Sequence, residues 1–307
     1  MSARIEPAVD EAGLSDGPVA ASSTGRRLIA ALPCRCESAR LWGKPLQPLA
    51  PGLPIVAHLA SSLRRFGCVT EVRLAIARGA GEEALIGLAE RTGMAYFVGS
   101  EEDVLGRVIA TARAAGATDV LRKTSEDPFF DISMLEPAWA RHIADGNDVT
   151  ALDLVPEGTA FEIFTLAALQ RCHELGGPSD REHIANYARF HQSEFAVEIL
   201  HPAPECQRLD LRLTVDNPED LILCRAVFHA LGGHEHLIPL GDERLIPLAE
   251  IIAFLDSHPE LTELVRPFVD PRPTWEGLAQ AGTDAEQGTA STCSPDHTRQ
   301  PQPNSHA

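Results

Sequence analysis

R-L-I-A-A-L-P-C-R-C-E-S-A-R-L-W-G-K-P-L-Q-P-L, residues 27–49, is the stretch that decides the fold. Its apolar start, residues 28–32, has the length of a buried strand, and Pro33 ends it. Five cations within residues 26–44 stand against one acid, Glu37, in a chain whose net charge is −18. A cationic loop at the carboxyl end of a first strand is where an α/β sheet binds a polyphosphate, although a solvated basic loop has the same composition.

Three side chains in this loop have the chemistry that phosphate oxygens require. Arg35 and Arg40 carry guanidinium forks, and Lys44 adds a point charge beside Gly43. In a phosphate-binding loop, backbone N–H groups would complete the contacts.

The same loop resembles a known signature. Residues 33–46 are similar to P-x-R-x-x-S-x-R-L-x-G-K-P-L, the nucleotide-binding motif of the cytidylyltransferases. That family includes the CMP-octulosonate and CMP-sialate synthetases, and the match is best to its spore-coat polysaccharide type. The resemblance implies that the nucleotide is bound by Pro33, Cys34, Arg35, Ser38, Arg40 and Lys44.

The loop departs from the family pattern at three positions. Cys34 stands where alanine is usual, Glu37 replaces a small residue, and Trp42 replaces a common proline. Glu37 matters most, because a carboxylate inside a triphosphate loop repels the ligand unless it is turned outward.

Strand and helix patterns alternate after the loop. Strands are expected at 71–77, 94–98 and 119–123, and helices at 55–66, 82–92 and 104–115, each helix ending at a glycine. This alternation predicts an α/β fold with a doubly wound, mostly parallel sheet. The resemblance implies a Rossmann-like, glycosyltransferase-A-like nucleotidyltransferase with a small acceptor or dimerisation subregion at about 150–200.

A glycine pair in this region permits another interpretation. Gly79 and Gly81 follow a strand and precede a helix, and Glu101 lies about twenty residues on, as in a dinucleotide fingerprint. However, the glycines follow the second strand, and Glu82 and Glu83 occupy the helix start where a pyrophosphate would bind. A nicotinamide-dependent oxidoreductase is therefore a minor alternative.

Residues 99–107, G-S-E-E-D-V-L-G-R, resemble the family's G-S-x-x-D-V-L-x-R. The match implies that Asp103 contacts the nucleotide, with Arg107 also able to face it. The residues also suit the start of a helix, with Ser100 as its N-cap. Both interpretations stay open.

Two further blocks supply candidate magnesium ligands. Residues 122–131 resemble R-x-T-G-D-x-P-x-x-D, which implies nucleotide contacts from Arg122 and Thr124 and puts Glu126 at the metal position, with Asp127 as the alternative. Carboxylate oxygens are the ligands that Mg²⁺ prefers.

The second block, residues 211–220, reads L-R-L-T-V-D-N-P-E-D and resembles L-R-L-T-V-D-x-P-E-D. We expect a strand at 212–215 that delivers Asp216 as the second metal carboxylate. Asp216 would otherwise cap the helix that follows, but Asn217 is able to do so instead. Arg212 is a candidate acceptor-binding residue.

Candidate acceptor residues come from the middle of the chain. Glu162 lies among apolar neighbours in a block similar to G-x-x-x-E-x-F, so its carboxylate needs a ligand hydroxyl or an arginine as a partner. Residues 179–184 match S-x-R-E-H-[VI], and Ser179 and Glu182 have capping-box spacing. In the family, Arg181 and His183 lie near the acceptor and the subunit contact.

Composition sets limits on the location and partners of the protein. The 307 residues divide into a polar leader at 1–25, a domain at 26–270 and a tail at 271–307. We expect both ends to be disordered. No apolar run reaches the ~18 residues of a membrane span, and no signal peptide is recognisable. Seven scattered cysteines suit reduced thiols and a cytoplasmic location, and the net charge of −18 argues against a nucleic-acid partner, which would require a basic face.

Together the blocks imply a Mg²⁺-dependent enzyme that transfers CMP from CTP to a small anionic or hydroxylated acceptor and releases pyrophosphate. Arg35, Arg40 and Lys44 would stabilise the charge of the reacting phosphates, and a homodimer is expected from the resemblance. A nucleotide-binding homologue with impaired catalysis is the main alternative, because Glu37 and Glu126 are unusual at their positions.

Overall fold

The computed structural model describes residues 25–232, 244–269 and 274–278 of the chain. Nearly all of the predicted leader, residues 1–24, lies outside the described part. So does most of the predicted tail. None of the helices in the described ranges is both long and apolar enough to traverse a bilayer.

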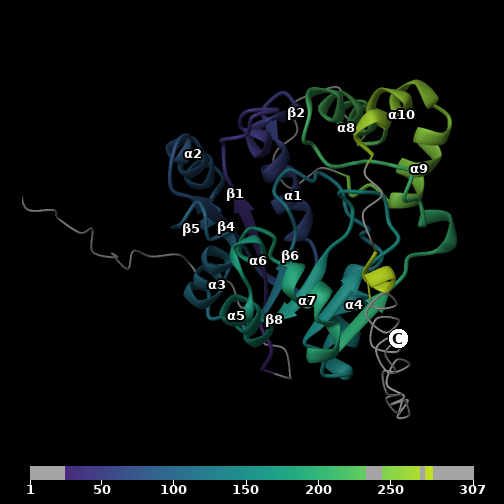
Figure 1. The fold of residues 1–307 in the computed structure, drawn as a ribbon. Helices are drawn as coiled ribbons and strands as arrows, with labels where there is room; N and C mark the ends of the chain where they lie inside the picture. Colours follow the sequence, from purple (N-terminus) through teal and green to yellow (C-terminus); the bar gives the residue numbers. More distant parts are fainter. Residues whose placement is uncertain (1–24, 233–243, 270–273, 279–307) are drawn as a thin grey trace, which may run out of the picture.

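A seven-stranded sheet forms the centre of the described molecule, with strand order β5-β4-β1-β6-β8-β7-β9 (Figure 1). A separate two-stranded ribbon, β2-β3, precedes the first helix. The strands have the bounds β1 Leu28–Cys34, β2 Pro48–Ala50, β3 Leu53–Pro54, β4 Val69–Ala77, β5 Ala95–Gly99, β6 Asp119–Arg122, β7 Val149–Leu152, β8 Glu162–Thr165 and β9 Val197–Leu200.

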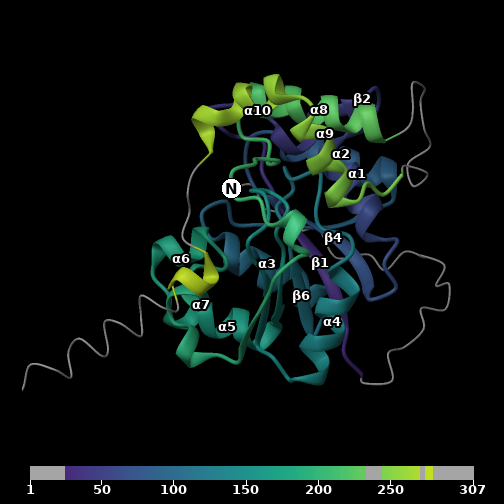
Figure 2. The ribbon, with the colours of Figure 1, turned by 90° about the vertical axis from the view of Figure 1, so that its right-hand side faces the viewer.

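Helices cover both faces of this sheet. Their bounds are α1 Ile55–Leu63, α2 Glu82–Thr92, α3 Val104–Ala114, α4 Leu135–Ala144, α5 Leu166–Leu175, α6 Pro178–Glu182, α7 Asn186–Phe190, α8 Pro218–Leu231, α9 Leu248–Asp256 and α10 Pro259–Val265. Figure 2 shows α3 and α5 on one side of the sheet and α1 and α4 on the other, whereas α8, α9 and α10 gather at one end (Figure 1).

The alternation of side chains along β1 explains these two layers. Leu28, Ala30 and Leu32 belong to the core that α1, α4, α8 and α9 complete, whereas Ile29 and Ala31 face the core of α3, α5 and α7. A strand covered on both faces has to be apolar throughout, and five of its seven residues are fully buried aliphatic side chains. The doubly wound fold is therefore confirmed.

The direction of the strands fixes where a ligand can bind. β1 pairs in parallel with β4 on one side and with β6 on the other, so the order of the strands reverses between β1 and β6. Such a switch point opens a crevice at the carboxyl ends of the two strands. The sheet is mostly parallel, as predicted, but β8 runs antiparallel to both β6 and β7.

Several predicted details differ from the structure. Residues 212–215 form no strand; a single parallel bridge joins Arg212 to Glu157. The predicted tail begins at 271, yet residues 274–278 pack against the domain and Trp275 is only 2% exposed. The six cysteines within the described residues are free thiols, in line with the expectation of a reduced protein.

Candidate active site

The first loop leaves β1 at Cys34 and turns back at Gly43. Gly43 has the left-handed φ of 62°, and its N–H donates to the Cys36 carbonyl at 2.7 Å, which closes the loop. Lys44 follows at once in a 3₁₀ turn, Lys44–Leu46. The turn directs the ammonium group into the crevice, where the Lys44 side chain is 13% exposed. The motif has glycine at position 43 because the backbone there adopts a left-handed conformation that glycine tolerates best.

The second loop follows β6 and holds a buried ion pair. Lys123, whose side chain is 1% exposed, donates to Asp127 at 2.9 Å and also to the Gly158 carbonyl. Thr124 donates a further hydrogen bond to Asp127. Burial lowers the pKa of Lys123. Asp127 is therefore occupied by its own loop, whereas the Glu126 carboxylate accepts a 3.2 Å hydrogen bond from the Ser125 hydroxyl.

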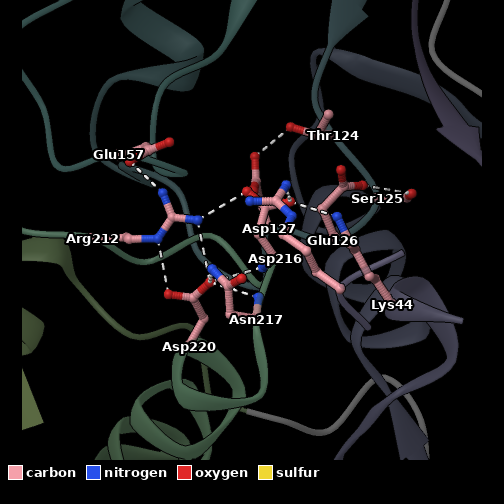
Figure 3. A network of polar contacts seen from close by, with 11 residues as sticks. Lys44, Thr124, Ser125, Glu126, Asp127, Glu157, Arg212, Asp216, Asn217 and Asp220 are labelled. Atoms are coloured by element: carbon pink, nitrogen blue, oxygen red, sulfur yellow. Dashed lines mark hydrogen bonds and ion pairs between the residues drawn. The ribbon is translucent and has the colours of Figure 1, made fainter. Parts of the chain in front are cut away.

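Backbone contacts join the second loop to the segment before α8. The N–H of Val215 donates to the Glu126 carbonyl at 3.2 Å, so Glu126 and Asp216 come from adjacent backbone segments (Figure 3). Gly158 packs against this segment so closely that a Cβ atom there would lie 2.4 Å from the Thr214 nitrogen. Its φ of +90° also excludes most other residues.

Three cations converge on the Asp216 carboxylate, and Figure 3 labels two of them, Lys44 and Arg212. Lys44 Nζ lies 2.5 Å from Oδ1, an Arg40 guanidinium nitrogen lies 3.0 Å from the same oxygen, and Arg212 donates to Oδ2 at 2.9 Å. Burial alone would raise the pKa of Asp216, but Lys44, with Arg40 and Arg212, outweighs burial and lowers it.

Arg212 holds the Asp216 carboxylate in place from the buried side of the crevice. Its side chain is 2% exposed and bonds Glu157, Asp216 and Asp220. Asp220 in turn accepts from the N–H groups of Asp216 and Asn217 at the start of α8. Asn217 is the N-cap, so Asp216 does not have that role.

The pKa of Glu126 is shifted in the opposite direction to that of Asp216. Burial raises its pKa, and the negative charges of Asp127 and Asp216 raise it further, whereas Lys44 lowers it. Glu126 and Asp216 thus share one crevice. Of these two carboxylates, Asp216 is the one that pairs with several cations among the described residues.

Two cavities meet at this crevice. The smaller, about 200 Å³, is lined by predicted nucleotide residues of the first loop and by Glu37, and the larger, about 720 Å³, extends away from it between the second loop and α7. They share Arg122, Thr124, Glu126 and His183. The predicted residues that line at least one cavity are Pro33, Cys34, Arg35, Ser38, Arg40, Lys44, Arg122, Thr124, Glu126, Glu162, His183 and Asp216.

Of the two partners expected for the Glu162 carboxylate, the structure shows an arginine. Arg122 and Glu162 are directly opposite on β6 and β8, and their side chains form a 3.2 Å ion pair at the edge of the larger cavity. The antiparallel direction of β8 brings Glu162 to the same end of the sheet as the loops that follow β1 and β6.

Three predicted contact residues line neither cavity. Asp103 caps α3 by accepting from the Gly106 N–H at 2.8 Å, and it pairs with His173 at 2.7 Å. Asp103, rather than Ser100, is thus the N-cap of α3. Arg181 is exposed on α6, and Arg212 is buried in its carboxylate network. Ligand contacts for Asp103, Arg181 and Arg212 stay predictions.

The structure adds residues to those expected from the motifs. Arg107, which the match to G-S-x-x-D-V-L-x-R allows to face the nucleotide, is 3% exposed, donates to the Ala75 carbonyl at 3.0 Å and lines the smaller cavity. Arg189 and Trp275 line the larger cavity from outside every matched motif. Their spacing of 86 positions offered no sequence signal, whereas the G-S-x-x-D-V-L-x-R block did include Arg107.

The donor set suits a divalent ion that is bound together with phosphates. Mg²⁺ in proteins often has one or two carboxylate ligands, and substrate phosphates and waters complete its octahedron. Glu126 and Asp216 provide these two carboxylates on adjacent segments. Among the described residues no cluster of three or more His, Cys, Asp or Glu side chains forms a preformed metal cage. The residues therefore fit Mg²⁺ delivered with a nucleotide.

Comparisons with known proteins agree with this geometry. The family model described as Cytidylyltransferase matches residues 29–250. The Spore coat polysaccharide biosynthesis protein SpsF of Bacillus subtilis (strain 168) is 27% identical over 232 residues, which cover 74% of this chain and 92% of that protein.

Two solved structures share the fold. A cytidylyltransferase from Leptospira borgpetersenii serovar Hardjo-bovis has a TM-score of 0.68 at 19% identity, covering 77% of this chain and 97% of its own. CMP:2-keto-3-deoxy-manno-octonic acid synthetase, solved in complex with CTP, has a TM-score of 0.52 at 16% identity, covering 66% and 99%.

Proposed function

This chain belongs to the cytidylyltransferase family, and we propose that it transfers CMP from CTP to a small acceptor in a Mg²⁺-dependent reaction that releases pyrophosphate. One observation carries the proposal: Lys44 and Arg40 converge on Asp216 beside Glu126 at the switch point of the sheet. Cations for a triphosphate and carboxylates for its metal ion lie in one crevice.

The triphosphate would bind at the first loop. Arg35, Arg40 and Lys44 would stabilise the charge that moves onto the leaving pyrophosphate, as fixed cations do in phosphoryl-transfer sites. Pro33, Cys34 and Ser38 line the same cavity. The Cys34 thiol itself is inert, because burial raises its pKa to about 12.

Glu126 and Asp216 would hold Mg²⁺. When bound, the ion offsets the negative charge of the phosphates and polarises the phosphoryl group that is attacked. Ligand binding at Asp216 requires Lys44 and Arg40 to move from the carboxylate toward the phosphates, and both side chains are long enough to pivot. Arg212 would keep Asp216 oriented during this exchange, because its own contacts are buried.

The acceptor would enter through the larger cavity. Its oxygen attacks the α-phosphorus, a new P–O bond forms, and the bond to the leaving pyrophosphate breaks. His183 lies on both cavities and would contact the acceptor close to the reacting phosphate. Glu162, held by Arg122, would accept a hydrogen bond from an acceptor hydroxyl. Arg181 would contribute only in a homodimer that brings it to a neighbouring site.

Glu37 gives a specific reason to keep a second candidate function. This exposed residue lines the smaller cavity, so it lies at the proposed triphosphate site. A protein in which this repulsion prevents productive alignment would bind CTP without turnover. Release of pyrophosphate in the presence of an acceptor distinguishes the two functions, and Glu37→Gly should increase CTP affinity if the repulsion is real.

The nicotinamide alternative has little support. The Glu82 carboxylate accepts a 3.2 Å hydrogen bond from the Gly79 N–H, so the chain's own acid occupies the glycine turn that a pyrophosphate would need. Family membership also points to a nucleotidyltransferase. We propose a cytoplasmic location.

Thermal unfolding in the presence of each of the four ribonucleoside triphosphates tests the proposed function. A ligand that binds only the folded protein raises its stability. CTP with Mg²⁺ should raise the unfolding temperature more than ATP, GTP or UTP do, and EDTA should remove most of the effect. Equal or absent protection by all four triphosphates would reject the proposed transfer of CMP from CTP.

A further inference from the structure

One carboxylate that lines the larger cavity takes no part in the proposed reaction. Asp153 directly follows β7 and is 8% exposed. Since β8 is antiparallel to both β6 and β7, those two strands run in the same direction and end at the same edge of the sheet. Asp153 therefore lies on the same edge as the loop that carries Glu126.

Contacts on two sides hold Asp153 in place. Its N–H donates to the Leu200 carbonyl of β9 at 2.9 Å. Its Oδ2 accepts a 3.3 Å hydrogen bond from the Glu276 N–H, and the Glu276 carboxylate pairs with His201 at 3.2 Å. Residues 274–278, which lie beyond the end of the family model at residue 250, thus hold the carboxylate from one side.

These contacts use only one of the two carboxylate oxygens. Across the described ranges, Oδ1 of Asp153 accepts no hydrogen bond, yet burial does not seal this atom off. Because the residue lines the larger cavity, Oδ1 opens into it. A carboxylate that is largely removed from bulk water needs hydrogen-bond donors for both oxygens. A ligand in the cavity is able to supply the missing donor.

The arginines of the larger cavity do not offset the charge of Asp153. Each of the three has a partner of its own: Arg40 pairs with Asp216, Arg122 pairs with Glu162, and Arg189 lies over the Trp275 ring. Within the part of the chain that the structure describes, no ion pair reaches Asp153.

Most other carboxylates of this cavity do have a cation. The pairs are Asp127 with Lys123, Glu157 with Arg212, Glu162 with Arg122, Asp210 with Arg208, and Asp216 with Lys44. The two that remain are Glu126, the proposed magnesium ligand, and Asp153. Asp153 would therefore repel an anionic group in the cavity and attract a hydroxyl or ammonium group.

We propose that Asp153 selects the acceptor by accepting a hydrogen bond from a hydroxyl or ammonium group on it, and that it rejects acceptors with an anion at that position. The cavity of about 720 Å³ suits a sugar-sized molecule, since small-molecule sites measure about 300–1,000 Å³. This inference rests on the proposed function, because the larger cavity is taken as the acceptor site.

Three sugars with the same ring and different charges test the proposal. The full chain, saturated with CTP and Mg²⁺, is titrated with D-glucose, D-glucosamine and D-glucuronate, and its thermal unfolding is followed. Sugars also stabilise proteins by exclusion from their surface, but that effect rises linearly, whereas binding saturates. Glucose or glucosamine should give saturating protection, and glucuronate should not. Stronger protection by glucosamine than by glucose would identify an ammonium group as the donor.

An isosteric variant separates the charge of Asp153 from its structural contact. Asp153→Asn keeps a carbonyl for the Glu276 N–H, so the ligand-free variant should unfold close to the wild-type temperature. Its affinity for the protecting sugar should fall by about tenfold, the loss expected for a charge-assisted hydrogen bond. Its discrimination against glucuronate should shrink as well, which a purely structural role would not explain. Asp145→Asn, at an exposed position after α4, is the matched control and should bind like wild type.

Three outcomes would overturn the inference while CTP still protects the protein: equal sugar affinity in wild type and Asp153→Asn, protection by glucuronate equal to that by the other sugars, or no saturating protection by glucose or glucosamine. The proposed function would survive each of these. If CTP itself gives no protection, the proposed function fails instead. The same titrations without nucleotide then decide whether Asp153 binds a sugar.

Discussion

Lys44 Nζ lies 2.5 Å from Oδ1 of Asp216, although 172 positions separate the two residues. The first loop and the segment before α8 thus meet at one ion pair. The same cation that would meet the triphosphate is held by the same carboxylate that would meet magnesium. Ligand binding has to exchange this pair for two new ones, and the following predictions depend on that exchange.

Replacing Lys44 should remove both binding and turnover. Lys44→Ala takes away the cation nearest to the carboxylates, so we expect pyrophosphate release to fall by about 10²–10³-fold, as for other groups that stabilise transition-state charge. The protection by CTP should fall as well. Arg78→Ala, at an exposed cation after β4, is the control and should change neither quantity. Near-normal turnover of Lys44→Ala would contradict the phosphate role.

Asp216→Asn should abolish the magnesium-dependent part of CTP binding. The change keeps the size of the side chain but removes the charge that holds Lys44, Arg40 and Arg212. Calorimetric titration of CTP with and without Mg²⁺ measures it. An unchanged magnesium effect would mean that Asp216 serves only to hold its cations. Asp145→Asn, at an exposed position after α4, should bind like wild type.

The lowered pKa of Asp216 also predicts a pH dependence of stability. A carboxyl whose pKa is lower in the folded state stabilises the protein above its unfolded pKa of about 3.9, and this contribution disappears as the pH falls through the folded pKa. The free energy of unfolding of wild type should therefore exceed that of Asp216→Asn at pH 7. The gap should narrow below about pH 4. A constant gap would contradict the pairing.

Glu126→Gln should make the protein more stable and less active. The pKa of Glu126 is raised, so the folded state pays to ionise it, and wild type loses stability relative to the amide as the pH rises through that raised pKa. At pH 8 the variant should therefore unfold at a higher temperature than wild type, and at pH 4 the two should converge. Its CTP binding should lose Mg²⁺ dependence. A variant that is less stable at pH 8 would show that the Glu126 carboxylate has favourable contacts.

Arg212 should matter for stability far more than a surface arginine does. Arg212→Leu leaves the fully buried Asp220 carboxylate without its cation, and the loss of one partner of a buried ion pair costs about 3–5 kcal/mol. Arg208 pairs with Asp210 and Asp256 on the surface, so Arg208→Leu should cost less than about 1 kcal/mol. Urea unfolding compares the two. Equal costs would argue against a buried network behind Asp216.

Local signals explain what was predictable in the fold. Helix α2 was predicted at 82–92 and has these bounds, because two glutamates start it and Gly93 ends it in a left-handed conformation. β8 and β9 were missed, since each has only four residues and neither shows a clear alternation of apolar and polar side chains. The segment at 212–215 looks like a strand, but its arginine is drawn into a carboxylate network and only one residue bridges.

In the candidate site, too, some features were predictable from local sequence and others were not. The loops after β1 and β6 were predictable because phosphate-binding residues cluster within short, continuous motifs. Asp103 shows the limit of a motif, since its partner His173 lies 70 positions away and its N-cap role depends on the helix starting at Val104. The Arg189–Trp275 contact follows only from the way residues 274–278 return to α7.

A crystal structure of the full chain with CTP and Mg²⁺ tests the central claim most directly. The account predicts the triphosphate between Arg35, Arg40 and Lys44, and a metal ion whose protein ligands are the carboxylates of Glu126 and Asp216. Density for the nucleotide elsewhere, or an ion that touches neither carboxylate, would contradict it.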